Sequence, residues 1–108
     1  MRQAEVYNNG LLAGILTEVS SREYIFRYDD RYWSDSSRPA ISLTMPKNKQ
    51  EHYSDHLFPF FANMLSEGDN REVQMRLHKL DREDDFGFLL ATAQTDTAGA
   101  ITVKPVVS

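Results

Sequence analysis

The spacing of apolar residues changes along this chain, and the change limits the folds that it can adopt. In several segments before residue 46 apolar and polar residues alternate, which is typical of β-strands with one buried face. From residue 58 to residue 93 apolar residues recur at the three- and four-residue spacing of amphipathic helices, and segment 101–105 alternates again. The order predicts one α+β domain, a small and mainly antiparallel β-sheet with three short helices packed on it.

A hairpin begins the predicted sheet. Val6 and Tyr7 lead into Asn8-Asn9-Gly10, and an apolar strand returns from Leu11 to Val19. Asn-Gly readily takes the positive φ angles of a tight turn between antiparallel strands. Gly14 lies inside the return strand, where a missing side chain suits either a bulge or the close approach of another backbone.

The next segments alternate less regularly. In segment 24–28 three aromatic residues share one face of a predicted strand, while Ile25 and Arg27 take the other. Residues 29–39 read as a polar loop that carries Tyr32 and Trp33. Residues 41–45 predict a short strand closed by Pro46, and 47–55 an exposed loop.

The second half predicts three helices and a last strand. A helix from Phe58 ends near Gly68, a second begins at Asp69 with a capping-box Glu72, and an acidic stretch, 81–85, favours the start of a third. A strand over 101–104 ends at Pro105. The apolar faces of the three helices are Phe58, Phe61, Ala62 and Leu65; Val73, Leu77 and Leu80; and Phe86, Leu89, Leu90 and Ala93.

Composition excludes several classes of protein. A chain of 108 residues fits one domain, assigned to 1–108, and leaves no room for a catalytic lobe beside a binding domain. Sixteen acidic against twelve basic residues give a net charge of −4, which disfavours direct contact with nucleic acid. The absence of cysteine excludes disulfides, thiolate nucleophiles and iron–sulfur clusters. No apolar run approaches the roughly 20 residues of a membrane span or resembles a secretory signal, so we expect a cytoplasmic protein without a membrane partner.

Two motifs resemble catalytic or metal sites. Asp85-Phe86-Gly87 spells the triplet with which protein kinases hold magnesium, but the glycine-rich loop, strand lysine and catalytic loop of a kinase do not precede it. It therefore predicts a capped helix start with a core phenylalanine. His52 and His56 could share a helix face and bind a metal, but a third ligand is not evident, which favours an exposed polar stretch. His78 reads as a boundary or surface residue, and we predict no catalytic residue, metal or cofactor.

Three aromatic residues suit contact with a protein partner. Tyr32 and Trp33 lie in a polar loop, and Phe60 falls off the apolar stripe of its helix. Aromatic side chains are enriched among the residues that dominate protein interfaces. The alternatives are that Tyr32 and Trp33 fold back over the sheet edge and that Phe60 contacts the sheet from a tilted helix.

An ordered series of short motifs resembles the N-terminal subdomain of HipA-type toxin kinases. The series covers nearly the whole chain, and it departs from the family at 64–68, where Met-Leu-Ser-Glu-Gly replaces the usual Leu-Leu-Pro-Glu-Gly. The motifs are Val6-Tyr7-Asn8-Asn9-Gly10, Gly14-Ile15-Leu16, Phe26-Arg27-Tyr28-Asp29, Ile41-Ser42-Leu43-Thr44-Met45-Pro46, Phe60-Phe61-Ala62-Asn63 continuing to Gly68, Asp85-Phe86-Gly87-Phe88-Leu89-Leu90 and Ala98-Gly99-Ala100.

The resemblance implies a function without catalysis. In HipA-like proteins this subdomain precedes a Ser/Thr kinase core, and in three-gene systems it is a separate subunit, HipS, which binds and neutralises the truncated kinase HipT while the helix-turn-helix protein HipB binds the operator. We therefore expect a HipS-like antitoxin that contacts a HipA- or HipT-like kinase core, and a HipB-like protein only through that complex. The alternative is a detached or cloned N-terminal module that supports folding or substrate docking of a HipA-like kinase. A small metal-dependent enzyme using His52 and His56 is a third hypothesis.

Overall fold

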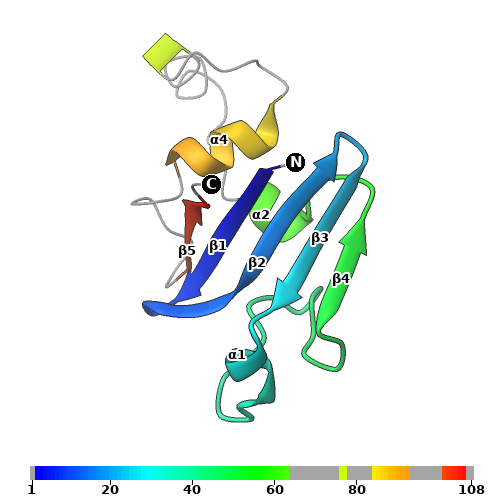
Figure 1. Ribbon diagram of the computed structural model, residues 1–108, viewed down its shortest axis with the longest axis vertical. Helices are drawn as coiled ribbons and strands as arrows, with labels where there is room; N and C mark the ends of the chain where they lie inside the picture. The colour runs from blue at the N-terminus through cyan, green and yellow to red at the C-terminus, as the bar shows by residue number, and fades with distance from the viewer. Residues whose placement is uncertain (1, 64–75, 78–83, 93–100, 107–108) are drawn as a thin grey trace.

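The computed structural model describes residues 2–63, 76–77, 84–92 and 101–106, and these form a single α+β unit (Figure 1). Five strands make one sheet in the order β4-β3-β2-β1-β5, with every neighbouring pair antiparallel. The predicted fold class is confirmed, while the 1–108 extent of the domain stays a prediction. The elements are β1 (Arg2–Asn8), β2 (Leu11–Ser20), β3 (Glu23–Tyr28), α1 (Asp30–Ser34), β4 (Glu51–Ser54), α2 (Pro59–Ala62), α4 (Asp85–Thr92) and β5 (Ile101–Pro105).

The predicted hairpin is confirmed. Asn8 pairs with Leu11, and the two residues between them have positive φ angles, 53° at Asn9 and 81° at Gly10. Two such residues are the requirement of a type I′ turn, whose twist matches that of the strands it joins. The turn fixes the register of β1 on β2 from its first pair.

Gly14 lies next to a bulge and is closely approached by a neighbouring backbone. Val6 pairs with Gly14 but Tyr7 pairs with Leu12, so Ala13 is an extra residue in β2 and forms a bulge. A Cβ atom on Gly14 would lie 2.4 Å from the carbonyl oxygen of Arg27 on β3. The bulge also binds the residue that follows β3, because the Ala13 carbonyl oxygen accepts a hydrogen bond from the Asp29 amide at 2.8 Å.

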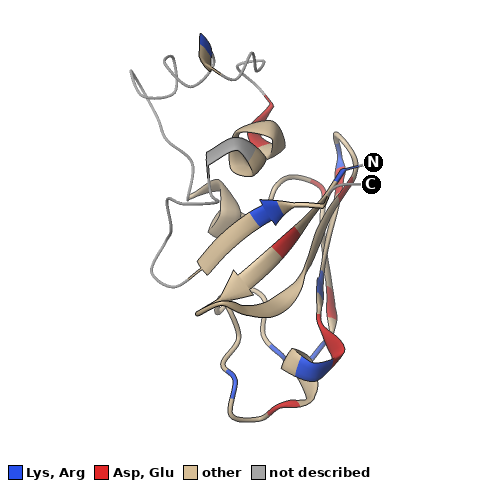
Figure 2. Cartoon of the chain, turned by 60° about the vertical axis from the view of Figure 1, so that its left-hand side comes forward, with Lys and Arg blue, Asp and Glu red and all other residues tan. Residues whose placement is uncertain are grey.

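The core lies on the face of the sheet that α2 and α4 cover (Figure 2). The aromatic face of β3 is buried as predicted, whereas Arg27 is exposed and Ile25 half-buried on the other face. Phe26 contacts Phe61 of α2, with ring centroids 5.9 Å apart, and Tyr24 contacts Phe86 of α4 at 6.3 Å. The fully buried core residues of these elements include Ala4, Val6, Leu16, Phe26, Tyr28, Phe61, Phe86, Leu89 and Val103.

Two predictions between residues 41 and 55 are wrong. Residues 41–45 are not a strand, because the Met45 amide donates to the Ser42 carbonyl oxygen at 3.1 Å and closes a turn. Residues 51–54, predicted to lie in a loop, form β4 and pair with β3. β4 is an edge strand of polar residues that are half-buried or exposed, so it lacks the apolar alternation by which a half-buried strand is recognised.

The helices differ from the predictions in length and position. The polar loop 29–39 contains α1, whose N-cap Asp29 accepts hydrogen bonds from the Arg31 and Tyr32 amides. α2 starts at Pro59 with Phe61 buried, and α4 buries Phe86 and Leu89, as predicted. Leu65, Gly68, His78, Ala93 and nearly all of the second predicted helix lie outside the described residues. Leu77, assigned to the apolar face of that helix, is helical but 72% exposed.

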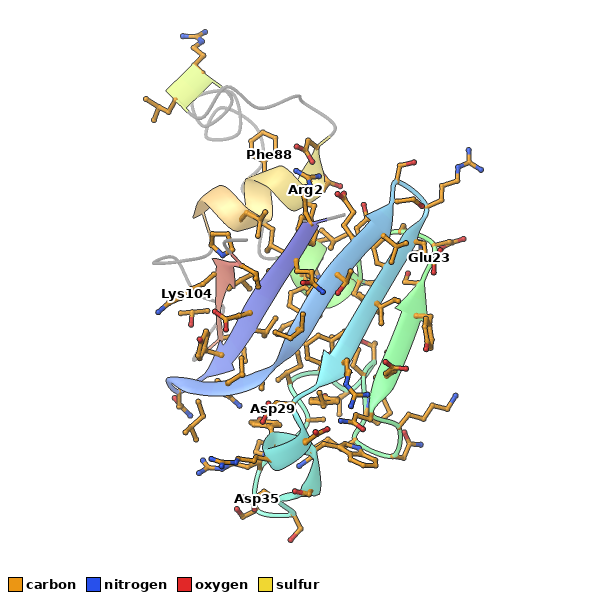
Figure 3. All side chains as sticks on the ribbon, viewed as in Figure 1. Arg2, Glu23, Asp29, Asp35, Phe88 and Lys104 are labelled. Atoms are coloured by element: carbon orange, nitrogen blue, oxygen red, sulfur yellow. The ribbon has the colours of Figure 1, made fainter. Side chains whose placement is uncertain are left out.

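Arg2 fastens α4 to the sheet (Figure 3). Its guanidinium forms ion pairs with Glu18 of β2 at 2.8 Å and with Asp84 at 2.7 Å, and lies 5.2 Å from the ring centroid of Phe86. Asp84 also accepts the Gly87 amide at 3.1 Å, which caps the start of α4. The hydrogen bonds from Arg2 lower the pKa of Asp84, although burial acts in the opposite direction.

We expect Gly14→Ala to lower the free energy of unfolding by about 3 kcal/mol, because the new methyl group would overlap a backbone carbonyl that cannot swing away. Urea denaturation measures this loss. Gly10→Ala is the matched control, since a Cβ there meets nothing within 4 Å and only the positive φ angle opposes it, at a cost of about 1 kcal/mol. Equal losses in the two variants would contradict the steric explanation.

We expect Arg2→Gln to lower the free energy of unfolding by about 1 kcal/mol at pH 7, after allowance for solvent screening of the half-exposed guanidinium. Since the pKa of Asp84 is lowered in the folded protein, this stabilisation is complete above about pH 4 and is lost as the pH falls through the folded-state value. The free energies of unfolding of the two proteins should therefore differ less at pH 3 than at pH 7, and denaturation curves at each pH measure this difference. A difference that does not change with pH would refute the assignment to Asp84.

Candidate protein-interaction site

The connection between β3 and β4, residues 29–50, is the most developed feature outside the sheet. It extends past one end of the strands and contains α1 but no strand (Figures 1 and 3). Connections longer than about 12–15 residues with little regular structure are uncommon in compact domains and often carry function. We refer to residues 29–50 as the β3–β4 connection.

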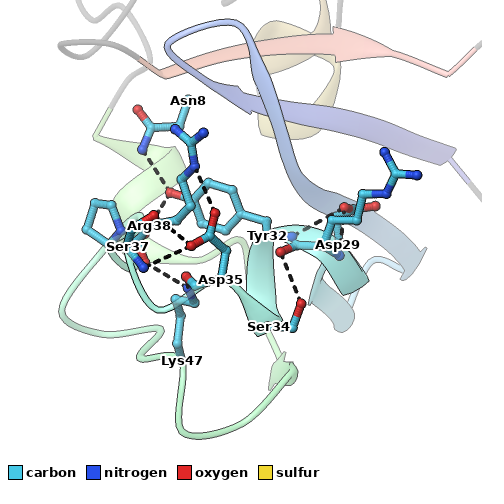
Figure 4. Close-up of polar contacts among 10 residues, drawn as sticks. Asn8, Asp29, Tyr32, Ser34, Asp35, Ser37, Arg38 and Lys47 are labelled. Carbon is cyan, nitrogen blue, oxygen red and sulfur yellow. Dashed lines mark hydrogen bonds and ion pairs between the residues drawn. The ribbon is translucent and has the colours of Figure 1, made fainter.

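Tyr32 joins the connection to the core. Its ring stacks on that of Tyr28, with centroids 5.9 Å apart and planes 4° from parallel. Its hydroxyl accepts a hydrogen bond from Asn8 Nδ2 at 2.9 Å and donates to the Pro39 carbonyl oxygen at 2.6 Å (Figure 4). Tyr32 is only 4% exposed, so it holds the connection in place from within.

Lys47 closes the connection on the other side. Its Nζ donates to the carbonyl oxygens of Asp35 and Arg38, both at 2.7 Å, and lies 5.1 Å from the centroid of the Tyr32 ring. Asp35 accepts hydrogen bonds from the amide and hydroxyl of Ser37 and pairs with Arg38 at 3.4 Å. The Ser37 hydrogen bonds are the main reason that the pKa of Asp35 is lowered. These contacts hold the β3–β4 connection in one conformation, although this segment has few hydrogen bonds of regular secondary structure.

Tyr28 supports the connection from the sheet. Its buried hydroxyl donates to the Met45 carbonyl oxygen and accepts from the Ile41 amide, the latter at 3.2 Å. Burial raises the pKa of this hydroxyl, so it keeps the proton that it donates to Met45.

Trp33 presents the aromatic surface of the connection. It is 39% exposed, and its indole Nε1 donates to the Lys47 carbonyl oxygen at 2.9 Å, which fixes the ring. Tyr32 and Trp33 are therefore brought together on α1, one inward and one partly outward. Phe60 is half-buried on α2, where its ring meets Phe61 edge-on at 5.3 Å. Contact of these three residues with a partner stays a prediction.

An open cavity of about 500 Å³ lies between α1 and the start of β2. Its walls combine two leucines with two carboxylates and two guanidinium groups. This mixture suits several small contacts with a protein surface better than one ligand of a single charge. The lining residues are Leu11, Leu12, Asp29, Arg31, Tyr32, Asp35 and Arg38.

The two histidines singled out by the sequence do not share a helix. His52 lies on β4, with its Nε2 2.8 Å from the Pro46 carbonyl oxygen and its ring edge-on to Tyr28. His56 follows the strand, and its Nδ1 is 2.6 Å from Asp55. Across the described residues, no three side chains of the His, Cys, Asp and Glu types come close enough to hold a metal ion.

The triplet Asp85-Phe86-Gly87 is a helix start, as predicted. Asp85 begins α4, Phe86 is fully buried and Gly87 donates its amide to Asp84. In the part of the chain that the structure describes, no helix has the length and hydrophobicity that a bilayer span requires.

Sequence reasoning missed two large side chains on the surface, Leu43 and Tyr53. Leu43 is 98% exposed in the β3–β4 connection, and Tyr53 is 65% exposed on β4. Both lie where the strand assignment was wrong. Pro39 and Pro46, which bracket the segment of Leu43, were the available signal that this segment is irregular rather than a strand.

Comparisons with known proteins agree with this fold. A solved structure described as the N-terminal domain of HipA toxin matches with a TM-score of 0.75 and 28% identity, covering 100% of this chain and 95% of the other. An uncharacterised protein of Haemophilus influenzae is 29% identical over 104 residues, which is 96% of this chain and 92% of that protein.

Two longer relatives come from Sinorhizobium fredii, where they carry the names "Putative kinase" Y4dM and Y4mE. They are 30% and 26% identical over 96 and 105 residues, or 83% and 97% of this chain. The chain spans only 23% and 25% of their lengths. The sequence profile of the family described as HipA N-terminal domain matches residues 4–104, and the chain therefore belongs to the HipA N-terminal domain family.

Proposed function

We propose that this protein is a non-catalytic antitoxin-type subunit that binds and neutralises a HipA- or HipT-like Ser/Thr kinase. One observation carries the proposal. The family domain makes up nearly all of the Haemophilus influenzae relative, whereas it corresponds to about a quarter of the two relatives named as kinases. The same domain thus occurs within longer chains and as most of a small separate protein. Such a separate domain is suited to bind, as an independent subunit, the kinase core to which the domain is joined in the longer chains.

The described residues support a binding role rather than a catalytic one. Their most organised polar network, in the β3–β4 connection, consists largely of contacts to backbone groups and is used to hold the loop. Trp33 stands on this rigid support with two-fifths of its surface exposed. Preorganised surface lowers the entropy lost on association, so such a loop is an efficient docking element.

Neutralisation requires only that the subunit prefer one state of the kinase. If it binds the inactive conformation more tightly than the active one by about 3 kcal/mol, the equilibrium shifts by more than a hundredfold. A HipB-like operator-binding protein would then be reached through the kinase rather than directly. The cytoplasmic location expected from the sequence is part of this proposal.

A second function is favoured by the relatives Y4dM and Y4mE, in which the matching segment belongs to a much longer chain. In this alternative the domain is an N-terminal module that supports folding or substrate docking of a HipA-like kinase without inhibiting it. It would bind the kinase core equally well in the active and inactive states.

Co-expression with a HipA-like kinase core separates the two functions. Growth rescue together with one stoichiometric complex on purification supports the antitoxin, and a complex without rescue supports the structural module. The absence of both would refute the proposed partnership.

We expect Trp33→Ala to raise the Kd for the kinase core at least tenfold, because truncation of a central aromatic anchor commonly costs about 2 kcal/mol or more. The melting temperature should change little, since the ring is partly exposed and makes one hydrogen bond to the backbone. Titration calorimetry and thermal denaturation measure the two effects. Tyr53→Ala is the matched control, as an exposed aromatic outside the connection.

A large fall in the melting temperature of Trp33→Ala would instead assign Trp33 to the core. Equal losses of affinity in the Trp33 and Tyr53 variants would contradict a specific role for α1.

A further inference from the structure

Leu43 is exposed to solvent on the turn at residues 42–45, whose backbone is held by several hydrogen bonds. Its side chain is 98% exposed, whereas the neighbouring apolar residues Ile41 and Met45 are buried in the core. Single exposed apolar residues are common on protein surfaces, so exposure alone assigns no role to Leu43. The construction of the turn is more informative.

The turn is closed by hydrogen bonds at its tip and at its base. At the tip the Met45 amide donates to the Ser42 carbonyl oxygen at 3.1 Å, and the Thr44 amide donates to the Ser42 hydroxyl at 3.2 Å. At the base the Tyr28 hydroxyl bonds to the Ile41 amide and the Met45 carbonyl group, one on each side of the turn. The backbone that carries Leu43 is therefore held from both sides.

Leucine at this position runs against the usual chemistry of turns. Tips of turns favour Gly, Pro, Asn, Asp and Ser, whose side chains suit the backbone or bond to it. Here the Ser42 and Thr44 hydroxyls, 2.9 Å apart, do the bonding, and Leu43 between them makes no contribution to the core. A rigid turn that holds an apolar side chain in water loses little entropy when a partner covers that side chain.

The charge around the turn indicates the chemistry of the partner. Residues 36–50 contain Arg38, Lys47 and Lys49 and no carboxylate, in a chain whose net charge is −4. Arg38 pairs with Asp35 and Lys47 binds backbone carbonyl groups, while Lys49 forms no ion pair with a described residue. A surface with carboxylates beside an apolar pocket would complement this segment.

We propose that Leu43 is an anchor that inserts into an apolar pocket bordered by carboxylates on the kinase core. This inference rests on the proposed function and specifies the surface through which the subunit docks. Leu43 supplies the buried apolar area, and Lys49 of the same connection meets the acidic border.

Titration calorimetry with the purified kinase core tests the anchor. We expect Leu43→Ser to raise the Kd by about 10- to 100-fold, the value of burying one leucine side chain, while Leu43→Met restores most of the affinity. Val19→Ser is the matched control, because Val19 is an exposed aliphatic residue on β2 outside the connection. The melting temperatures of the Leu43 variants should stay close to that of the native protein, since the Leu43 side chain is almost fully exposed.

The outcomes separate this inference from the proposed function. Tight binding by both the native protein and Leu43→Ser overturns the anchor and leaves the proposed function standing. No binding by the native protein overturns both. Lys49→Glu tests the acidic border: a slower association rate supports it, and an unchanged rate at low ionic strength overturns it.

Discussion

The hydroxyl of Tyr28 is the contact on which the outer part of this structure depends. Its ring belongs to the buried face of β3 and stacks on Tyr32, while its oxygen binds the backbone at Ile41 and Met45. A single side chain thus links the sheet, α1 and the far half of the β3–β4 connection. Buried polar groups of this kind stabilise only when all their partners are present, so the connection is specified as one unit.

Much of the fold could be predicted from the sequence because turn residues and the spacing of apolar residues are local signals. Asn9 and Gly10 supply positive φ angles to the hairpin, and Phe86 and Leu89 bury the apolar face of α4. β4 could not be predicted, since an edge strand of polar residues is made by pairing with β3 and not by an apolar pattern.

The candidate site was predicted only in part, for a related reason. The position of Trp33 in a polar segment identified the connection, but the alternation at 41–45 placed Leu43 on the inner face with Ile41 and Met45. Alternation does not distinguish a strand from a turn whose two ends are buried. The contacts that make this segment a turn are the hydrogen bonds from Tyr28 and the one between Ser42 and Met45. They depend on tertiary structure or on backbone conformation, so no periodic pattern in the sequence predicts them.

The pairing of β1 with β5 has a consequence for the order of folding. Val6 lies opposite Val103, and the Val106 amide donates to the Gln3 carbonyl oxygen, so β1 is paired on its second edge by residues about a hundred positions later in the chain. Contacts between residues so distant in sequence slow the folding of small domains. During synthesis on the ribosome, β1 and β2 can form their hairpin early, but the free edge of β1 stays open until β5 has emerged. The sheet can therefore close only after β5 has been synthesised and has left the ribosome.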